Sequence, residues 1–139
     1  MTHIDSELKL FVFQVSGIKF GADTEQILEL IDLETAETEG VSVQWFHEMI
    51  PFREKNIIYK FPRVVILKGN EASGIIIDTP DDIFPVESSE IQPLPRLLEA
   101  TIRNSFIRGE VMIKDQMVLL VDFHKTVDCT SNSGGKIKQ

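Results

Sequence analysis

The fold of this chain is decided by its last apolar stretch, FIRGEVMIKDQMVLLVDF, which occupies residues 106–123. Phe106–Ile113 and Met117–Phe123 are rich in Val, Ile, Leu, Met and Phe, the composition of buried β-strands. The polar break Lys114-Asp115-Gln116 between them has the length of a tight turn. The stretch therefore predicts a β-hairpin, and it indicates a chain built from short strands.

The start of the chain repeats this pattern. Leu8–Val15 alternates between apolar and polar residues, Ser16-Gly17 supplies a turn, and Ile18–Ala22 is expected to return as a strand. Asp23-Thr24-Glu25-Gln26 has the form of a capping box. The apolar residues of 27–31 fit either one helical turn or a strand, and the pattern does not separate the two.

The middle of the chain predicts a second hairpin and a short helix. Val41–Phe52 is interpreted as a hairpin with its turn at His47-Glu48. Asp78-Thr79-Pro80-Asp81-Asp82-Ile83 carries a proline followed by two acids, which is a helix-start signature. The order of strand, glycine turn, strand, acidic segment and hairpin thus occurs twice along the chain.

Three further segments between these features are of β type. Ile57–Phe61 and Arg63–Leu67 are expected as strands separated by Pro62, which cannot donate a backbone hydrogen bond to a sheet. Lys68-Gly69-Asn70 then turns the chain into a returning strand at Ser73–Asp78.

Segments this short and this closely spaced predict an all-β protein of two barrel-like lobes with one or two short helical turns. We expect residues 1–7 to form an N-terminal arm and residues 8–125 one domain. Within it, the lobes are expected at about 8–60 and 61–125. Residues 126–139 are polar and predict a flexible tail.

Composition and charge limit the classes of partner that this chain can bind. The 139 residues carry a formal net charge of −8, with 14 scattered Lys and Arg, which disfavours nucleic acid and anionic membrane surfaces. The longest apolar run, Met117–Val121, is far shorter than a membrane span. Met1–Glu7 has no signal-peptide pattern, and the single cysteine, Cys129, forms no intramolecular disulfide. We therefore expect a cytoplasmic protein.

No residue pattern indicates catalysis. His47-Glu48 lacks a second histidine four residues after the first, because Pro51 stands there. Cys129 lies in a Ser/Asn/Gly tail without a partner histidine, and the glycines form no phosphate loop. We therefore expect no enzyme activity, no metal and no cofactor, and favour a protein-binding module over a small-ligand-binding barrel.

Four motifs in order resemble the CheW-like domain family, the adaptors that couple chemoreceptors to the histidine kinase CheA. Ile91-Gln92-Pro93-Leu94-Pro95 is similar to the family's Ile-x-Pro-x-Pro linker, and Phe106-Ile107-Arg108-Gly109 to its Ile-Arg-Gly strand start. The other two are a glycine, three apolar residues and an aspartate at 74–78, and the closing strand at 119–123. The resemblance covers about residues 8–125 and is strongest from Arg63 onward.

The resemblance implies two packed SH3-like five-stranded β-barrels and no catalytic activity. It also implies chemotaxis signalling in a two-component system, with a CheA-type regulatory domain and the helical tip of a receptor as partners. The chain departs from the family where Trp45-Phe46-His47 replaces an apolar-Arg-Gly element of the receptor-facing surface. A scaffold or regulator of a pathway other than chemotaxis therefore stays an alternative.

The candidate contact residues follow from this departure. Trp and Arg are enriched at interface hot spots, so we expect protein contacts from Arg108 and from a first set of residues between Trp45 and Arg53. Adjacent strand residues face opposite sides, so one of Trp45 and Phe46 is expected in the core. Arg108 has a second interpretation, an internal ion pair with Asp78 or Asp122. The first set consists of Trp45, Phe46, His47, Glu48 and Arg53.

Overall fold

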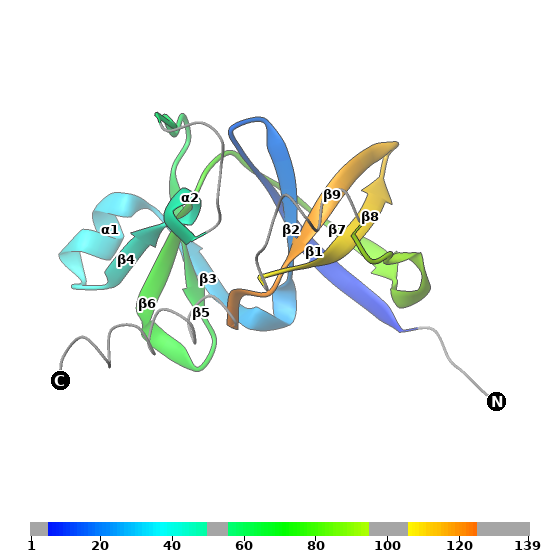
Figure 1. The fold of residues 1–139 in the computed structure, drawn as a ribbon. Coiled ribbons are helices and arrows are strands. Elements are labelled where there is room, and N and C mark those ends of the chain that lie inside the picture. The colour runs from blue at the N-terminus through cyan, green and yellow to red at the C-terminus, as the bar shows by residue number, and fades with distance from the viewer. Residues whose placement is uncertain (1–5, 50–55, 95–105, 125–139) are drawn as a thin grey trace, which may run out of the picture.

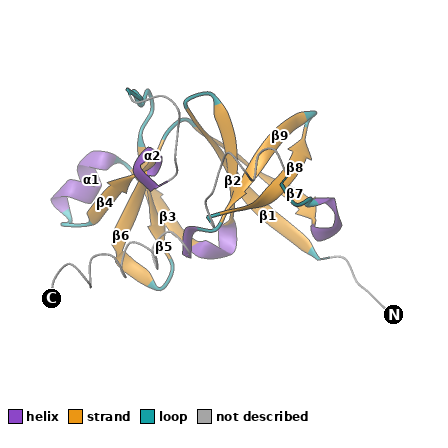
Figure 2. Cartoon of the chain, in the orientation of Figure 1, coloured by secondary structure: helices purple, strands orange, loops and turns teal. Residues whose placement is uncertain are grey.

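The computed structural model describes residues 6–49, 56–94 and 106–124 (Figure 1). Strands dominate these residues and the helices are short, which confirms the expected all-β class (Figure 2). The strands are β1 (Glu7–Val15), β2 (Ile18–Asp23), β3 (Ile27–Ile31), β4 (Ser42–Trp45), β5 (Arg63–Leu67), β6 (Asn70–Ile77), β7 (Pro80–Glu87), β8 (Ile107–Ile113) and β9 (Gln116–Val121). The helical segments are η1 (Thr24–Gln26), α1 (Leu33–Thr38), α2 (Phe46–Met49) and η2 (Ser88–Glu90).

The strands form two sheets, and each sheet draws on both halves of the chain. One sheet has five strands in the order β7-β1-β2-β9-β8, and the other has four described strands in the order β3-β5-β6-β4. Each contains one parallel pair, β2 with β9 and β4 with β6. Each of these two pairs joins a strand before residue 60 to a strand after residue 61, so each sheet contains strands from both sides of that position. The expected lobe boundaries stay a prediction. The expected tail at 126–139 lies outside the described residues.

Two hairpins form as the sequence predicted. β8 and β9 pair antiparallel through a turn at Lys114 and Asp115, which have φ of 51° and 65°. β1 and β2 pair through Ser16 and Gly17, with φ of 55° and 80°. Positive φ at both central residues matches the right-handed twist of the flanking strands, so each turn connects its strands without splaying them.

Three local predictions are wrong. Val41–Trp45 does not start a hairpin, because β4 pairs parallel with β6 and His47 and Glu48 lie in helix α2. Pro80 opens strand β7 rather than a helix, since its fixed φ suits the first position of either element. Residues 57–61 form no strand, although Arg63–Leu67 does.

The capping box predicted at residues 23–26, after β2, forms only at its Asp23 side. Asp23 caps η1 by accepting a hydrogen bond from the Glu25 N–H at 2.9 Å, as a capping residue does. The Gln26 side chain does not reach back to Asp23. It donates to Asp122 at 2.8 Å and accepts from the Phe123 N–H at 2.9 Å, so η1 is joined to the end of β9. The open choice at residues 27–31 resolves as strand β3.

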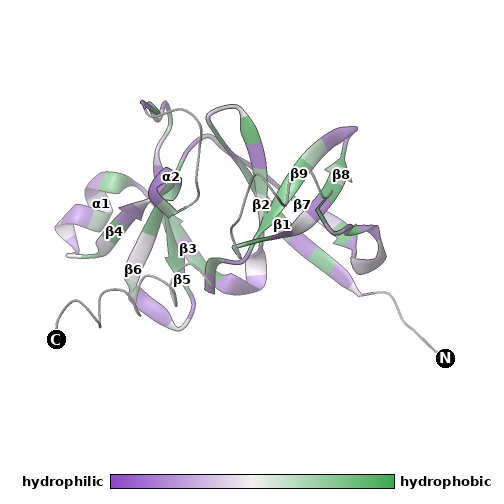
Figure 3. Ribbon diagram, viewed as in Figure 1, coloured by the Kyte–Doolittle hydropathy of each residue, from purple (hydrophilic) through white to green (hydrophobic). Residues whose placement is uncertain are grey.

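The main core lies between the two sheets. Phe13 is fully buried, and its ring lies 5.7 Å from the Phe20 ring, 5.2 Å from Phe46 and 6.1 Å from Phe123. Figure 3 shows that apolar residues follow the strands of both sheets, while the turn between β8 and β9 is hydrophilic. Stacked and edge-to-face aromatic rings stabilise the contact between the sheets beyond their buried area.

The outer edge of β8 is covered by the linker that follows β7. Gln92 and Glu110 exchange two backbone hydrogen bonds of 2.9 and 2.8 Å. A Cβ at Gly109 would lie 2.5 Å from the Gln92 carbonyl oxygen, so only glycine permits this approach. The linker thus protects a sheet edge from pairing with another chain.

Candidate protein-binding site

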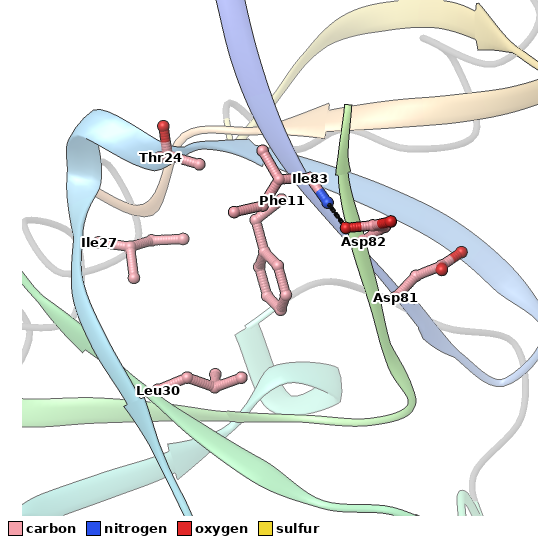
Figure 4. A pocket seen from close by; sticks show the side chains of 7 residues that line it. All are labelled: Phe11, Thr24, Ile27, Leu30, Asp81, Asp82 and Ile83. Atoms are coloured by element: carbon pink, nitrogen blue, oxygen red, sulfur yellow. Dashed lines mark hydrogen bonds between the residues drawn. The ribbon is translucent and has the colours of Figure 1, made fainter. Parts of the chain in front are cut away.

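An apolar groove of about 340 Å³ lies where the two sheets meet (Figure 4). Phe11 of β1 lies in its middle, Ile27 and Leu30 of β3 form one wall, and Ile83 of β7 stands on the other. The remaining lining residues are Thr24, Asp81 and Asp82. The groove therefore combines one residue set from the four-stranded sheet with another from the five-stranded sheet.

Strand register explains why these side chains share the groove. β1 pairs with β7 so that Phe11 is opposite Ile83, and the ladder is irregular between Phe11 and Phe13. Among the described strands β3 pairs with β5 alone, and its Ile27 and Leu30 line the groove. Phe11 is almost wholly buried and Ile83 is 51% exposed, so the groove has a fixed floor and an accessible rim.

The polar part of the groove is acidic. The Asp82 carboxylate accepts a hydrogen bond from the Ile83 N–H at 2.8 Å, and Asp81 forms a loose ion pair with Lys19 at 3.9 Å. Two carboxylates beside four apolar side chains offer no nucleophile or acid–base pair in a buried setting. An apolar recess of this kind accepts the side chains of an amphipathic helix.

The contact residues predicted from the sequence do not form one exposed surface. Phe46 is fully buried in the main core, whereas Trp45 is half-buried, as expected for one core residue of the two. His47 is also half-buried, and Glu48 is exposed. Arg53 lies outside the described residues.

Trp45 and His47 instead surround Tyr59, and we call these three the aromatic cluster. The Trp45 ring lies edge-on to Tyr59 at 4.8 Å, and the His47 ring lies 5.6 Å from Tyr59. The Tyr59 hydroxyl accepts the backbone N–H of His47 at 3.1 Å and lies 3.0 Å from its Nδ1. Burial raises the pKa of Tyr59 to about 12. The cluster therefore fixes the chain around Tyr59 against the end of β4.

Arg108 forms the ion pair that was one of its two interpretations. Its guanidinium donates to Asp122 at 2.9 Å, while its side chain remains 57% exposed. Asp122 also accepts the Gln26 amide, so three elements meet at this carboxylate. Asp78, the other candidate partner, is buried and accepts backbone N–H groups.

The groove was not found from the sequence. Phe11, Ile27 and Leu30 have the same pattern as core residues, and Asp81-Asp82-Ile83 was interpreted as a helix start. The one available signal for the groove was Ile83, which follows Asp81 and Asp82, because an apolar residue next to charged residues on an edge strand is often exposed.

Within the described residues, no group of three or more His, Cys, Asp or Glu side chains is arranged to hold a metal ion. No helix among those residues has the length and apolar character needed to cross a membrane.

Comparison with known proteins supports the fold. No protein-family model and no curated protein sequence matches the chain. Among solved structures, it is similar to the scaffolding protein TtCheW from Thermoanaerobacter tengcongensis, with a TM-score of 0.66 and 21% sequence identity. The match covers 84% of this chain and 89% of the other. The two-sheet arrangement is therefore CheW-like.

Proposed function

We propose that this protein is a non-catalytic scaffold that couples chemoreceptors to a CheA-type histidine kinase in the cytoplasm. The observation that carries the proposal is the likeness of its fold, over most of both chains, to a protein described as a scaffold. The sequence motifs at residues 74–78, 91–95, 106–109 and 119–123 support the same family.

The groove supplies a receptor-facing site of suitable chemistry. The cytoplasmic tip of a chemoreceptor is helical, and an amphipathic helix binds by placing apolar side chains at helical spacing into such a recess. Asp81 and Asp82 add a preference for helices with basic residues beside the apolar stripe. The groove does not use Trp45-Phe46-His47, so loss of the family's Arg-Gly element leaves this mode of docking intact.

A scaffold of this kind does not need tight individual contacts. Affinities near micromolar correspond to about 8 kcal/mol per contact, and assembly in an array makes them cooperative. Weak contacts of this size also allow the assembly to exchange its members.

Two binding measurements test the proposal. Isothermal titration calorimetry of the purified chain with a CheA-type regulatory domain is expected to give a dissociation constant of about 1–10 µM. No complex at tens of micromolar would count decisively against the coupling role. A complex with a non-chemotaxis kinase in its place would support the alternative, a regulator of another pathway.

The receptor arm uses a helical receptor-tip fragment with two matched variants. Ile83→Ser removes an exposed apolar side chain from the groove, and Met112→Ser removes one that is 59% exposed on β8, at the opposite edge of the five-stranded sheet. We expect Ile83→Ser to weaken binding about tenfold and Met112→Ser to leave it unchanged. Equal affinities for both variants would exclude the groove as the receptor site.

A further inference from the structure

A short loop before β5 exposes two large apolar side chains. Ile58 is 82% exposed and Phe61 is 64% exposed, more than any other large hydrophobic residue in the described part of the chain. Both belong to residues 58–61, which we call the 58–61 loop. Single exposed apolar residues are common, but a pair on one short loop indicates an interaction surface.

The loop is held rigidly from its C-terminal side by Asp78. This carboxylate is buried, and it accepts the backbone N–H groups of Lys60 at 3.1 Å and Phe61 at 2.6 Å. The Phe61 carbonyl in turn accepts the Thr79 N–H at 3.2 Å. These hydrogen bonds hold the backbone of Lys60 and Phe61, while the Phe61 side chain stays exposed to solvent.

The aromatic cluster holds the loop from its centre. Tyr59 points inward against Trp45 and His47, while its neighbours Ile58 and Lys60 are exposed. The backbone that carries the exposed side chains is thus held in place before a partner binds, which lowers the entropy cost of binding.

The loop's own exposed charge is positive, although the carboxylates of Asp78 and Glu48 act electrostatically on Tyr59. Residues 56–63 contain Lys60 and Arg63 and no acidic residue, in a chain of net charge −8. No ion pair joins the exposed Lys60 ammonium to another described residue. The chain's net charge opposes an anionic membrane as the occupant. Charge complementarity instead favours a protein surface on which carboxylates border apolar side chains.

We propose that the 58–61 loop is a second docking surface, which binds an apolar patch bordered by carboxylates on the kinase regulatory domain. This inference rests on the proposed function, and it assigns the kinase contact to a surface separate from the groove. Ile58 and Phe61 enter the apolar patch, and Lys60 pairs with a carboxylate at its border.

The test is calorimetric titration of the intact chain and three loop variants with the CheA-type regulatory domain. Ile58→Ser and Phe61→Ser are expected to weaken binding at least tenfold, and Lys60→Glu about fivefold. Raising the salt concentration is expected to weaken binding of the wild type more than that of Lys60→Glu. Met112→Ser is the matched control and is expected to bind as the wild type does, and thermal unfolding checks that each variant is folded.

The outcomes separate the loop assignment from the coupling function. Loop variants that bind the kinase domain as tightly as the wild type overturn the loop assignment and leave the coupling function standing. A wild type that does not bind at tens of micromolar overturns both. Two other results would assign the loop to another occupant and overturn the inference. One is a wild type that sediments alone as a dimer, which Ile58→Ser dissociates. The other is wild-type binding to phosphatidylglycerol vesicles that Ile58→Ser abolishes.

Discussion

The groove and the 58–61 loop differ in shape, in charge and in what holds them in place. The groove is a recess between two sheets, with Phe11 as its floor and two carboxylates on its rim. The loop precedes β5, carries Lys60 between its exposed apolar residues, and has its backbone fixed by the buried Asp78 carboxylate. Opposite shapes and opposite charges suit different partners, so one small chain can hold two proteins without their competing for one surface.

The largest expected effect that separates the two surfaces comes from Asp78→Ala. It leaves the N–H groups of Lys60 and Phe61 without their acceptor and removes one of the two acceptors of the Thr79 N–H, so we expect the free energy of unfolding to fall by about 3 kcal/mol. Urea denaturation followed by circular dichroism measures this loss. The kinase-domain affinity is expected to fall as well, while the receptor fragment binds unchanged.

Asp78→Asn is the matched control for that change. It keeps the shape and one acceptor oxygen, so both the stability loss and the loss of kinase affinity are expected to be smaller. If Asp78→Ala bound the kinase domain as tightly as the wild type, the rigid loop would have no role in docking.

A smaller effect is expected from Gly109→Ala, which changes stability at a distance from both surfaces. The new Cβ meets the Gln92 carbonyl, and moving the linker is expected to cost about 2 kcal/mol. Chemical denaturation gives the stability, and calorimetry is expected to give unchanged affinities for both partners. A loss of either affinity would mean that global stability, rather than the local surface, controls that contact.

The smallest effect is a pH dependence confined to the loop's anchor. The pKa of Tyr59 is raised from 10.0 to about 12, so the unfolded chain releases this proton at lower pH than the folded one. The stability contributed by Tyr59 is therefore complete below pH 10 and is lost as the pH rises towards 12. Because Tyr59 is the chain's only tyrosine, the ultraviolet absorbance of tyrosinate reports its titration directly.

Tyr59→Phe isolates this contribution. Between pH 10 and 12, its unfolding free energy is expected to fall less steeply than that of the wild type, although lysines titrate in both proteins. A folded-state titration of Tyr59 near pH 10 would show that the aromatic cluster does not enclose the hydroxyl.

What the sequence could predict was limited by distance along the chain. The β8–β9 hairpin was predictable because its strands and its turn at Lys114 and Asp115 are contiguous. The parallel pairing of Phe20 with Leu119 joins residues about a hundred positions apart, and no local pattern encodes it. Pro80 was misassigned because its fixed φ fits a strand start and a helix start equally well.

The same limit applies to the two surfaces. Phe11, Ile27 and Leu30 have a pattern that also fits the core, and the groove forms only where β1, β3 and β7 meet, with Ile83 exposed on its rim. Ile57–Phe61 has strand composition, yet the contacts of Tyr59 and the hydrogen bonds to Asp78 hold it outside both sheets. Asp122 was one of the two partners considered for Arg108 because both residues lie on one predicted hairpin, and the structure pairs these two.

The most direct test of two separate docking surfaces is sedimentation velocity of the chain with the kinase regulatory domain and the receptor-tip fragment together. We predict a complex that contains all three proteins, from which Ile83→Ser removes only the receptor fragment and Phe61→Ser only the kinase domain. Displacement of one partner by the other, or loss of both from either variant, would contradict the account.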